Sequence, residues 1–208
     1  KPIFKNYKLN LKSLVGKDIN SSFTLFAPQE VYVTPTTVYL SLSYCDEIIA
    51  KDRTYTLAFC ANGQTRKVEI TNESYEGEYN GYVFDLYNFY AMYVNELPQP
   101  QPNKAAIQKV LNKYCTKYFA KQLQNETLKK NLLLGSDQFD YQWLRSLEVH
   151  LMDEKTNTCI VNYKRADGKV IYKRIHLQLK PETEYEYLVS GVSDATEKDL
   201  PPMPNGEE

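Results

Sequence analysis

Residues 82–94 read Tyr-Val-Phe-Asp-Leu-Tyr-Asn-Phe-Tyr-Ala-Met-Tyr-Val, and this stretch decides the fold of the second half of the chain. Its apolar positions recur every three or four residues, which is the period of a helix with one buried face. These positions are Val83, Leu86, Tyr87, Tyr90, Tyr93 and Val94. Asn80 stands just before them and is a favourable helix cap. The sequence therefore predicts an amphipathic helix over residues 82–94.

Two shorter helices are predicted after it. Residues 97–102 read Leu-Pro-Gln-Pro-Gln-Pro and end the first helix, because proline lacks the N–H that a helix needs. Asn103 is predicted to cap a second helix with a single apolar face. That face holds Ile107, Val110, Leu111 and Tyr114. Thr116 is predicted to cap a third helix over residues 117–123.

Beyond Ser136 the apolar period changes from helical spacing to two. Residues 147–151 alternate in this way, and so do residues 171–179, with the turn signal Asp167-Gly168 between them. A last strand is predicted over residues 185–189. Helices followed by such a meander predict a curved antiparallel sheet wrapped around a helix, a cone with a pocket between the two layers.

The first third of the chain is predicted to be a small antiparallel sheet with one wet face. Residues 38–45, 54–60 and 66–71 alternate with period two, and Asn62-Gly63 is a hairpin turn signal. Two further strands are predicted on either side of Pro28. In the strand predicted over residues 38–45, Val38 and Leu40 are expected on the apolar face and Ser41 on the wet face.

The predicted fold class is therefore α+β, in three parts. Residues 1–76 form the antiparallel β domain, residues 80–190 the helix-and-sheet cone, and residues 191–208, which are acidic and rich in proline, a flexible tail. Residues 5–16 fit a short helix or an edge strand, and the sequence leaves both open.

Composition excludes several classes of protein. The chain has 208 residues, 42% of them hydrophobic, so it is long and apolar enough to fold. Its formal net charge is -1, so composition gives no electrostatic case for a nucleic-acid or anionic-membrane partner. There are 18 tyrosines and one tryptophan, a surplus that suits half-buried sheets and recognition surfaces.

The four cysteines, Cys45, Cys60, Cys115 and Cys159, contain no CxxC pair, which argues against a zinc ribbon or a redox motif. A hairpin centred near Ile49 would place Cys45 opposite Arg53, so a local bridge to Cys60 is poorly matched. Most of the thiols are expected to be small buried residues. Their pairing is otherwise left open.

Three pieces of residues 82–190 resemble a domain of unknown function from secreted lipoproteins of Gram-negative gut bacteria. They are the aromatic stretch at 83–93, Leu-Asn-Lys-Tyr-Cys-Thr at 111–116 and Ser-Asp-Gln-Phe-Asp-Tyr-Gln-Trp-Leu at 136–144. That domain belongs to the nuclear-transport-factor-2-like, or cystatin-like, superfamily. The resemblance implies a cone fold, export to the periplasm, outer membrane or cell exterior, and often a lipid-anchored precursor. It implies no activity.

Four residues are candidate ligand contacts. Tyr87 and Tyr90 lie on the helix that would line the cone, Asp140 is placed near its mouth, and Trp143 follows on the same acidic, aromatic turn. Enzymes of the superfamily use a tyrosine and a carboxylate for isomerase or dehydratase chemistry, which makes that chemistry the first alternative. The same residues also have a structural interpretation, in which the aromatic rings fill the core and Asp140 caps a helical turn.

The preferred hypothesis is an exported, non-catalytic binding protein that uses the cone or the N-terminal sheet. Its partner is an unknown small molecule or protein, with no nucleic acid and no cofactor. A further alternative is an immunity or inhibitor protein. His150 and His176 lie on the polar faces of their strands and lack the spacing of metal ligands, so no metal site is expected. The oligomeric state is left open.

Overall fold

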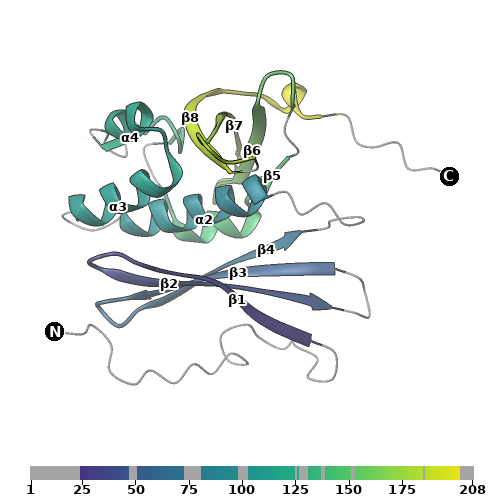
Figure 1. Ribbon diagram of the computed structural model, residues 1–208. Helices are drawn as coiled ribbons and strands as arrows, with labels where there is room; N and C mark the ends of the chain where they lie inside the picture. The colour runs from purple at the N-terminus through teal and green to yellow at the C-terminus, as the bar shows by residue number, and fades with distance from the viewer. Residues whose placement is uncertain are drawn as a thin grey trace. The chain divides into compact units, whose positions relative to one another are not determined.

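The computed structural model describes residues 24–46, 51–72, 81–97, 103–124, 126, 131–136, 139–150, 153–184 and 186–201, with the backbone alone given for residues 24–30, 42–46, 51–55 and 67–72. The chain divides into two compact units, Lys1–Tyr79 and Asn80–Glu208. The predicted α+β class is confirmed: a four-stranded antiparallel sheet precedes three helices and a second four-stranded antiparallel sheet (Figure 1). Two parts of the sequence predictions lie outside the described residues: the short helix or edge strand at residues 5–16, and the helix cap at Asn80.

The first unit is a meander of four strands in sequential order. Its strands are β1 (Thr24–Val33), β2 (Thr37–Asp46), β3 (Lys51–Cys60) and β4 (Thr65–Asn72). β1 continues through Pro28 as one strand, where two were predicted. β1 lies at the edge of the sheet, where a residue that cannot donate is tolerated, and a register shift between Pro28 and Glu30 follows it directly. The predicted turn at Asn62-Gly63 is present, with Gly63 at a φ of 85°.

The register of this sheet shows whether Cys45 and Cys60 could form a local disulfide bridge. Cys45 lies opposite Asp52, one residue from the expected Arg53, and Cys60 lies opposite Thr37. The two cysteines are thus at opposite ends of the β2–β3 ladder, which confirms that a local bridge does not fit.

The prediction of a wet face on this sheet is wrong at its centre. Ser41 is 1% exposed and its register partner Thr56 is fully buried, whereas Val38 and Leu40 on the other face are only partly buried. Tyr39 shares the face of Ser41 and is fully buried as well. Leu57 and Phe59, the register partners of Leu40 and Val38, are buried too, so the centre of this sheet is covered on both faces. Small hydroxyl side chains are compatible with such burial where they are hydrogen-bonded.

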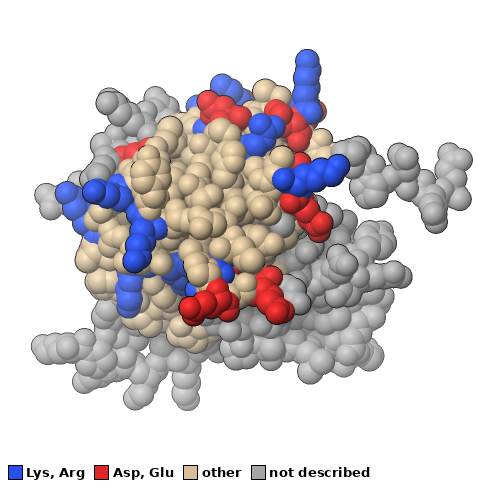
Figure 2. Space-filling view, turned by 45° about the horizontal axis from the view of Figure 1, so that its top comes forward, with Lys and Arg blue, Asp and Glu red and all other residues tan. Residues whose placement is uncertain are grey.

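The second unit begins with α2 (Gly81–Glu96), α3 (Lys104–Tyr114) and α4 (Lys117–Gln124). The predicted caps of the second and third helices are confirmed. Asn103 Oδ1 accepts the Ala106 N–H at 3.1 Å, and Thr116 Oγ1 accepts the Phe119 N–H at 3.4 Å. Basic side chains gather along the left edge of Figure 2, where α3 and α4 lie.

The second sheet has the order β5-β6-β7-β8 and is preceded by a short helix, η2 (Tyr141–Ser146). Its strands are β5 (Glu148–Val149), β6 (Thr158–Lys164), β7 (Val170–Leu179) and β8 (Tyr187–Asp194). The sheet curls over the helices in Figure 1, and α2 packs against its inner face. Tyr82 meets Tyr187 of β8 with ring centroids 6.2 Å apart, and Tyr90 meets Tyr163 of β6 at 6.5 Å.

The prediction of a flexible tail from residue 191 is wrong for residues 191–199. β8 runs on to Asp194, because Gly191 and Ser193 pair with His176 and Arg174 of β7. A short helix, η3 (Glu197–Asp199), follows, and its Asp199 carboxylate accepts both the N–H and the hydroxyl of Thr196 at 2.8 Å. Backbone pairing and this local cap order a segment that has few apolar residues. Residues 202–208 lie outside the described part.

Candidate functional site

Two of the predicted ligand contacts, Tyr90 and Trp143, are core residues. Tyr90 is fully buried and Trp143 is 7% exposed. Both rings meet Tyr163, at centroid distances of 6.5 and 6.4 Å, and Phe139 closes the cluster at 5.2 Å from Trp143. Aromatic side chains therefore fill the space between α2 and the sheet here. The structure confirms the interpretation of these two residues as core.

The hydroxyl groups of Tyr87 and Tyr90 hydrogen-bond to no acidic or basic side chain among the described residues. The Tyr87 hydroxyl accepts the Val149 N–H at 3.3 Å, and burial is the main cause that raises the pKa of Tyr87 to about 12. The Tyr90 hydroxyl has no hydrogen-bond partner among the described residues, and burial raises its pKa well above the ordinary value. Both phenols therefore stay protonated at neutral pH.

Asp140 is not part of that interior. Its side chain is exposed, and its Oδ1 accepts the Gln142 N–H at 2.9 Å, which caps η2. Within the described ranges, no carboxylate hydrogen-bonds to Tyr87 or Tyr90. The structure thus joins Tyr90 and Trp143 through Tyr163 but leaves Asp140 at the surface. Among the residues that the structure describes, neither Tyr87 nor Tyr90 forms the tyrosine–carboxylate pair that isomerase chemistry needs.

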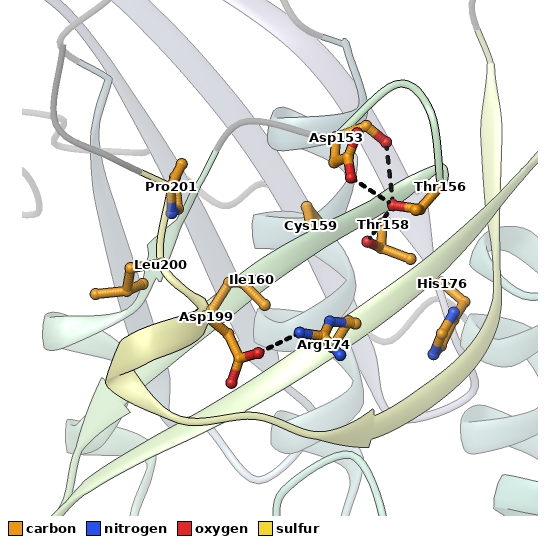
Figure 3. Close-up of a pocket in the computed structure, with 10 residues that line it drawn as sticks. All are labelled: Asp153, Thr156, Thr158, Cys159, Ile160, Arg174, His176, Asp199, Leu200 and Pro201. Carbon is orange, nitrogen blue, oxygen red and sulfur yellow. Dashed lines mark hydrogen bonds and ion pairs between the residues drawn. The ribbon is translucent and has the colours of Figure 1, made fainter.

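An open groove of about 860 Å³ lies instead on the outer face of the second sheet. Its floor comes from β6 and β7, one end from the turn between β5 and β6, and one wall from the segment after η3 (Figure 3). It is lined by Asp153, Thr156, Thr158, Cys159, Ile160, Arg174, His176, Asp199, Leu200 and Pro201. The pairing of Thr158 with His176 and of Ile160 with Arg174 puts these four residues on one face of the sheet.

An ion pair ties the wall of the groove to its floor. The Arg174 guanidinium contacts the Asp199 carboxylate, as the dashed line in Figure 3 shows. Hydrogen bonds from Thr196, followed by this contact with Arg174, hold the pKa of Asp199 below its ordinary value. Asp199 is therefore anionic at neutral pH. A guanidinium has five N–H donors in a fork, so Arg174 has donor capacity beyond this carboxylate.

The other end of the groove carries hydroxyl groups and an imidazole. The Thr156 hydroxyl donates to Asp153 Oδ2 at 3.0 Å and lies 2.8 Å from the Thr158 hydroxyl. His176 Nε2 lies 3.1 Å from Ser193 Oγ. Apolar contact is available from Ile160, Leu200 and Pro201. The groove thus offers donors, acceptors, one cation and an apolar surface within a single open space.

The nucleophiles near the groove are not activated. Burial raises the pKa of the Cys159 thiol to about 12, so it is protonated at neutral pH, and the thiolate is the reactive form. Ser193 and His176 form a pair, but none of the described carboxylates contacts the ring of His176. Without a group to orient the imidazole, this pair lacks the arrangement of a hydrolytic triad.

His150 belongs to a separate polar group on the same sheet face. Its Nε2 contacts Asn162 Oδ1, the Asn162 amide donates to Glu148 at 2.9 Å, and His150 lies 3.9 Å from that carboxylate. In the part of the chain that is described, no cluster of three or more His, Cys, Asp or Glu side chains could hold a metal ion. None of the described helices is long and apolar enough to cross a membrane.

Sequence reasoning missed the groove because one of its walls comes from the segment interpreted as a tail. The polar faces of β6 and β7 were visible as alternation, but Asp199, Leu200 and Pro201 carried no strand or helix period. The available signal was the spacing of Thr196 and Asp199, a threonine followed three residues later by an acid, which is typical of a helix start.

Comparisons with known protein families, with curated proteins and with solved structures find no match for this chain. The resemblance of residues 82–190 to the cystatin-like lipoprotein domain therefore stays a prediction, as do export and a lipid-anchored precursor.

Proposed function

We propose that this protein is a non-catalytic binding protein, and that the groove on the outer face of its second sheet takes a small polar ligand with an apolar part. The observation that supports the proposal is the contrast between the two faces of that sheet. Aromatic rings fill the inner side around Tyr90, whereas the outer side has an open groove of about 860 Å³. That volume is typical of small-molecule sites.

The chemistry of the lining sets the kind of ligand. Arg174 and His176 stand side by side on β7, and a ligand carboxylate or phosphate could share the guanidinium with Asp199. The hydroxyls of Thr156 and Thr158 both donate and accept hydrogen bonds. Ile160, Leu200 and Pro201 would cover an aliphatic or ring portion. We therefore favour a small organic anion with an apolar body.

The absence of activated groups supports binding over catalysis. The Cys159 thiol is protonated, the Ser193–His176 pair has no described acid to orient it, and the capping role of Asp140 separates it from the tyrosines. Isomerase chemistry in the cone would require the aromatic core around Tyr90 to open.

Ligand-observed NMR with a library of small carboxylates and phosphate esters tests the proposal. The groove variant Arg174→Ala/His176→Ala is expected to lose the hits that the unchanged protein binds. Arg145→Ala, an exposed cation on η2 that does not line the groove, is the matched control and should keep them. Far-UV circular dichroism and Trp143 fluorescence confirm that each variant is folded.

A different pattern of loss would redirect the proposal. Hits that survive in the groove variant but vanish in Tyr90→Phe would place the ligand in the interior, as the sequence first suggested. A library compound that is chemically converted on incubation with the protein would refute the non-catalytic interpretation.

A further inference from the structure

The helices α3 and α4 carry charge of one sign. Between Leu97 and Asn125 the chain has five lysines and no aspartate, glutamate or arginine. The lysines are Lys104, Lys109, Lys113, Lys117 and Lys121. Four of them are exposed, and Lys113 is partly buried with its Nζ 5.2 Å from the centre of the Tyr114 ring. Figure 2 shows basic side chains along the edge of the molecule where these helices lie. A chain with a net charge of -1 thus has a segregated positive surface.

The positions of these lysines oppose the ordinary rules for helix stability. Lys117 and Lys121 lie four residues apart on α4, so the like charges lie on one side of the helix and repel each other. Lys117 is also the first residue of α4, where the helix dipole favours an acidic side chain. Neither helix has an acidic residue in its first turn to offset this. An anionic surface outside the protein would remove both conflicts.

Two large side chains with apolar surface are exposed on α4 and in the turn beyond it. Tyr118 is 81% exposed, directly after Lys117 in α4. Leu132 is 41% exposed in the turn beyond α4, where its N–H donates to the Glu126 carboxylate at 2.9 Å. A tyrosine ring with a polar tip suits the boundary between water and lipid. Two described acidic side chains lie near parts of this surface. Glu126 accepts that hydrogen bond, and Glu186 is close enough to Lys113 to oppose the lowering of its pKa by burial.

We propose that this α3–α4 surface docks on a lipid bilayer that contains anionic headgroups. Anionic bilayers attract clusters of lysines on amphipathic helices through their negative surface potential. Lysine suits such a surface because its ammonium group is a compact charge on a long, flexible side chain. Sequence-reading nucleic-acid surfaces rely instead on arginine and asparagine that pair with base edges, and this segment has no arginine. The exposed Tyr118 and Leu132 give shallow apolar contact that an acidic protein segment would not require. This proposal is independent of the groove.

Co-sedimentation of the full chain with vesicles tests it. Binding is expected to vesicles of phosphatidylcholine mixed with phosphatidylglycerol, to be weak with phosphatidylcholine alone, and to fall as salt rises. The variant Lys117→Gln/Lys121→Gln should reduce the partition coefficient by roughly 30-fold, since each lysine near an anionic surface contributes about fivefold. The control Lys155→Gln/Lys169→Gln makes the same change in net charge on two exposed turn residues and should leave binding within about twofold.

A variant with a fluorescent reporter locates the contact. Tyr118→Trp gives the chain an exposed indole in addition to the buried Trp143. Brominated phosphatidylglycerol should quench the fluorescence of the added indole and leave that of Trp143 unchanged. Tyr118 is largely exposed, so this change is expected to leave the thermal unfolding midpoint unchanged. Equal loss of binding in both lysine variants, no quenching of the added indole, or no preference for anionic vesicles would each overturn the proposal. Salt-sensitive binding to single-stranded DNA without binding to vesicles would assign the surface to another polyanion.

Discussion

Asp85 on α2 carries a carboxyl group in an unfavourable place, and replacing it tests the electrostatics of the second unit. Burial, followed by the nearby Glu186 carboxylate, raises the pKa of Asp85 from 3.8 to about 6, against an opposing effect of Lys180. Lys180 only partly offsets this, because its Nζ lies 2.5 Å from a Glu186 carboxylate oxygen and pairs with that group. Asp85 is therefore ionised at neutral pH without a cation of its own among the described residues.

The sign of its effect on stability follows from the direction of the pKa change. The folded state holds this proton more tightly than the unfolded chain, so ionisation destabilises the fold. The contribution of Asp85 to stability is fully present below about pH 4 and is lost as the pH rises through about 6. A pKa difference of this size corresponds to about 3 kcal/mol, and residual contact with water reduces it to about 1–2 kcal/mol.

Asp85→Asn removes the titration, so we expect the variant to be more stable than the unchanged protein by about 1–2 kcal/mol at pH 8 and equal to it near pH 4. Urea unfolding followed by tryptophan fluorescence measures this in the second unit alone, because Trp143 is the one tryptophan of the chain. The exposed Glu154→Gln serves as a control for loss of one negative charge. A difference between Asp85→Asn and the unchanged protein that stays constant with pH, or a variant less stable at pH 8, would refute the reasoning.

Four further substitutions, at Gly135, Tyr90 and Asn103, probe the packing and helix capping of the second unit. Gly135→Ala should lower the free energy of unfolding by about 1–3 kcal/mol, because Gly135 has a φ of 58° and an added Cβ would lie 2.5 Å from Cε of Lys173; urea unfolding checks it. Tyr90→Phe should be neutral or stabilising by up to about 1 kcal/mol, since it deletes a buried hydroxyl with no described partner, whereas Tyr90→Ala should cost about 3–5 kcal/mol. Asn103→Ala should cost about 1 kcal/mol and lower the helical circular dichroism signal, because it removes the cap of α3.

Features set by neighbours in the sequence were predicted well. The caps at Asn103 and Thr116 and the helical period of α2 depend on residues within one or two turns, so side-chain type and spacing determine them. The expectation of a single buried face on α2 is wrong, because Asn88 and Met92 on its other side are fully buried as well. The expectation of a wet face on the first sheet failed. Ser41 is buried on one face and Leu57 on the other, because burial in a sheet depends on what covers each face, and alternation says only which residues share one.

The candidate site could not be predicted from the spacing of neighbouring residues, because the residues that form it are far apart in the sequence. Arg174 and Ile160 meet through strand pairing, and Asp199 reaches Arg174 only after β8 has returned along β7. Tyr90 and Trp143 stood out in the sequence because their aromatic rings are large and apolar. The same property favours their burial in the core. In this fold these aromatic residues pack against the inner face of the second sheet. The groove lies on the outer face of that sheet, and its lining residues, such as Thr158 and Arg174, are common on exposed strands. The place to look for a ligand is therefore the face whose polar side chains the pairing register brings together.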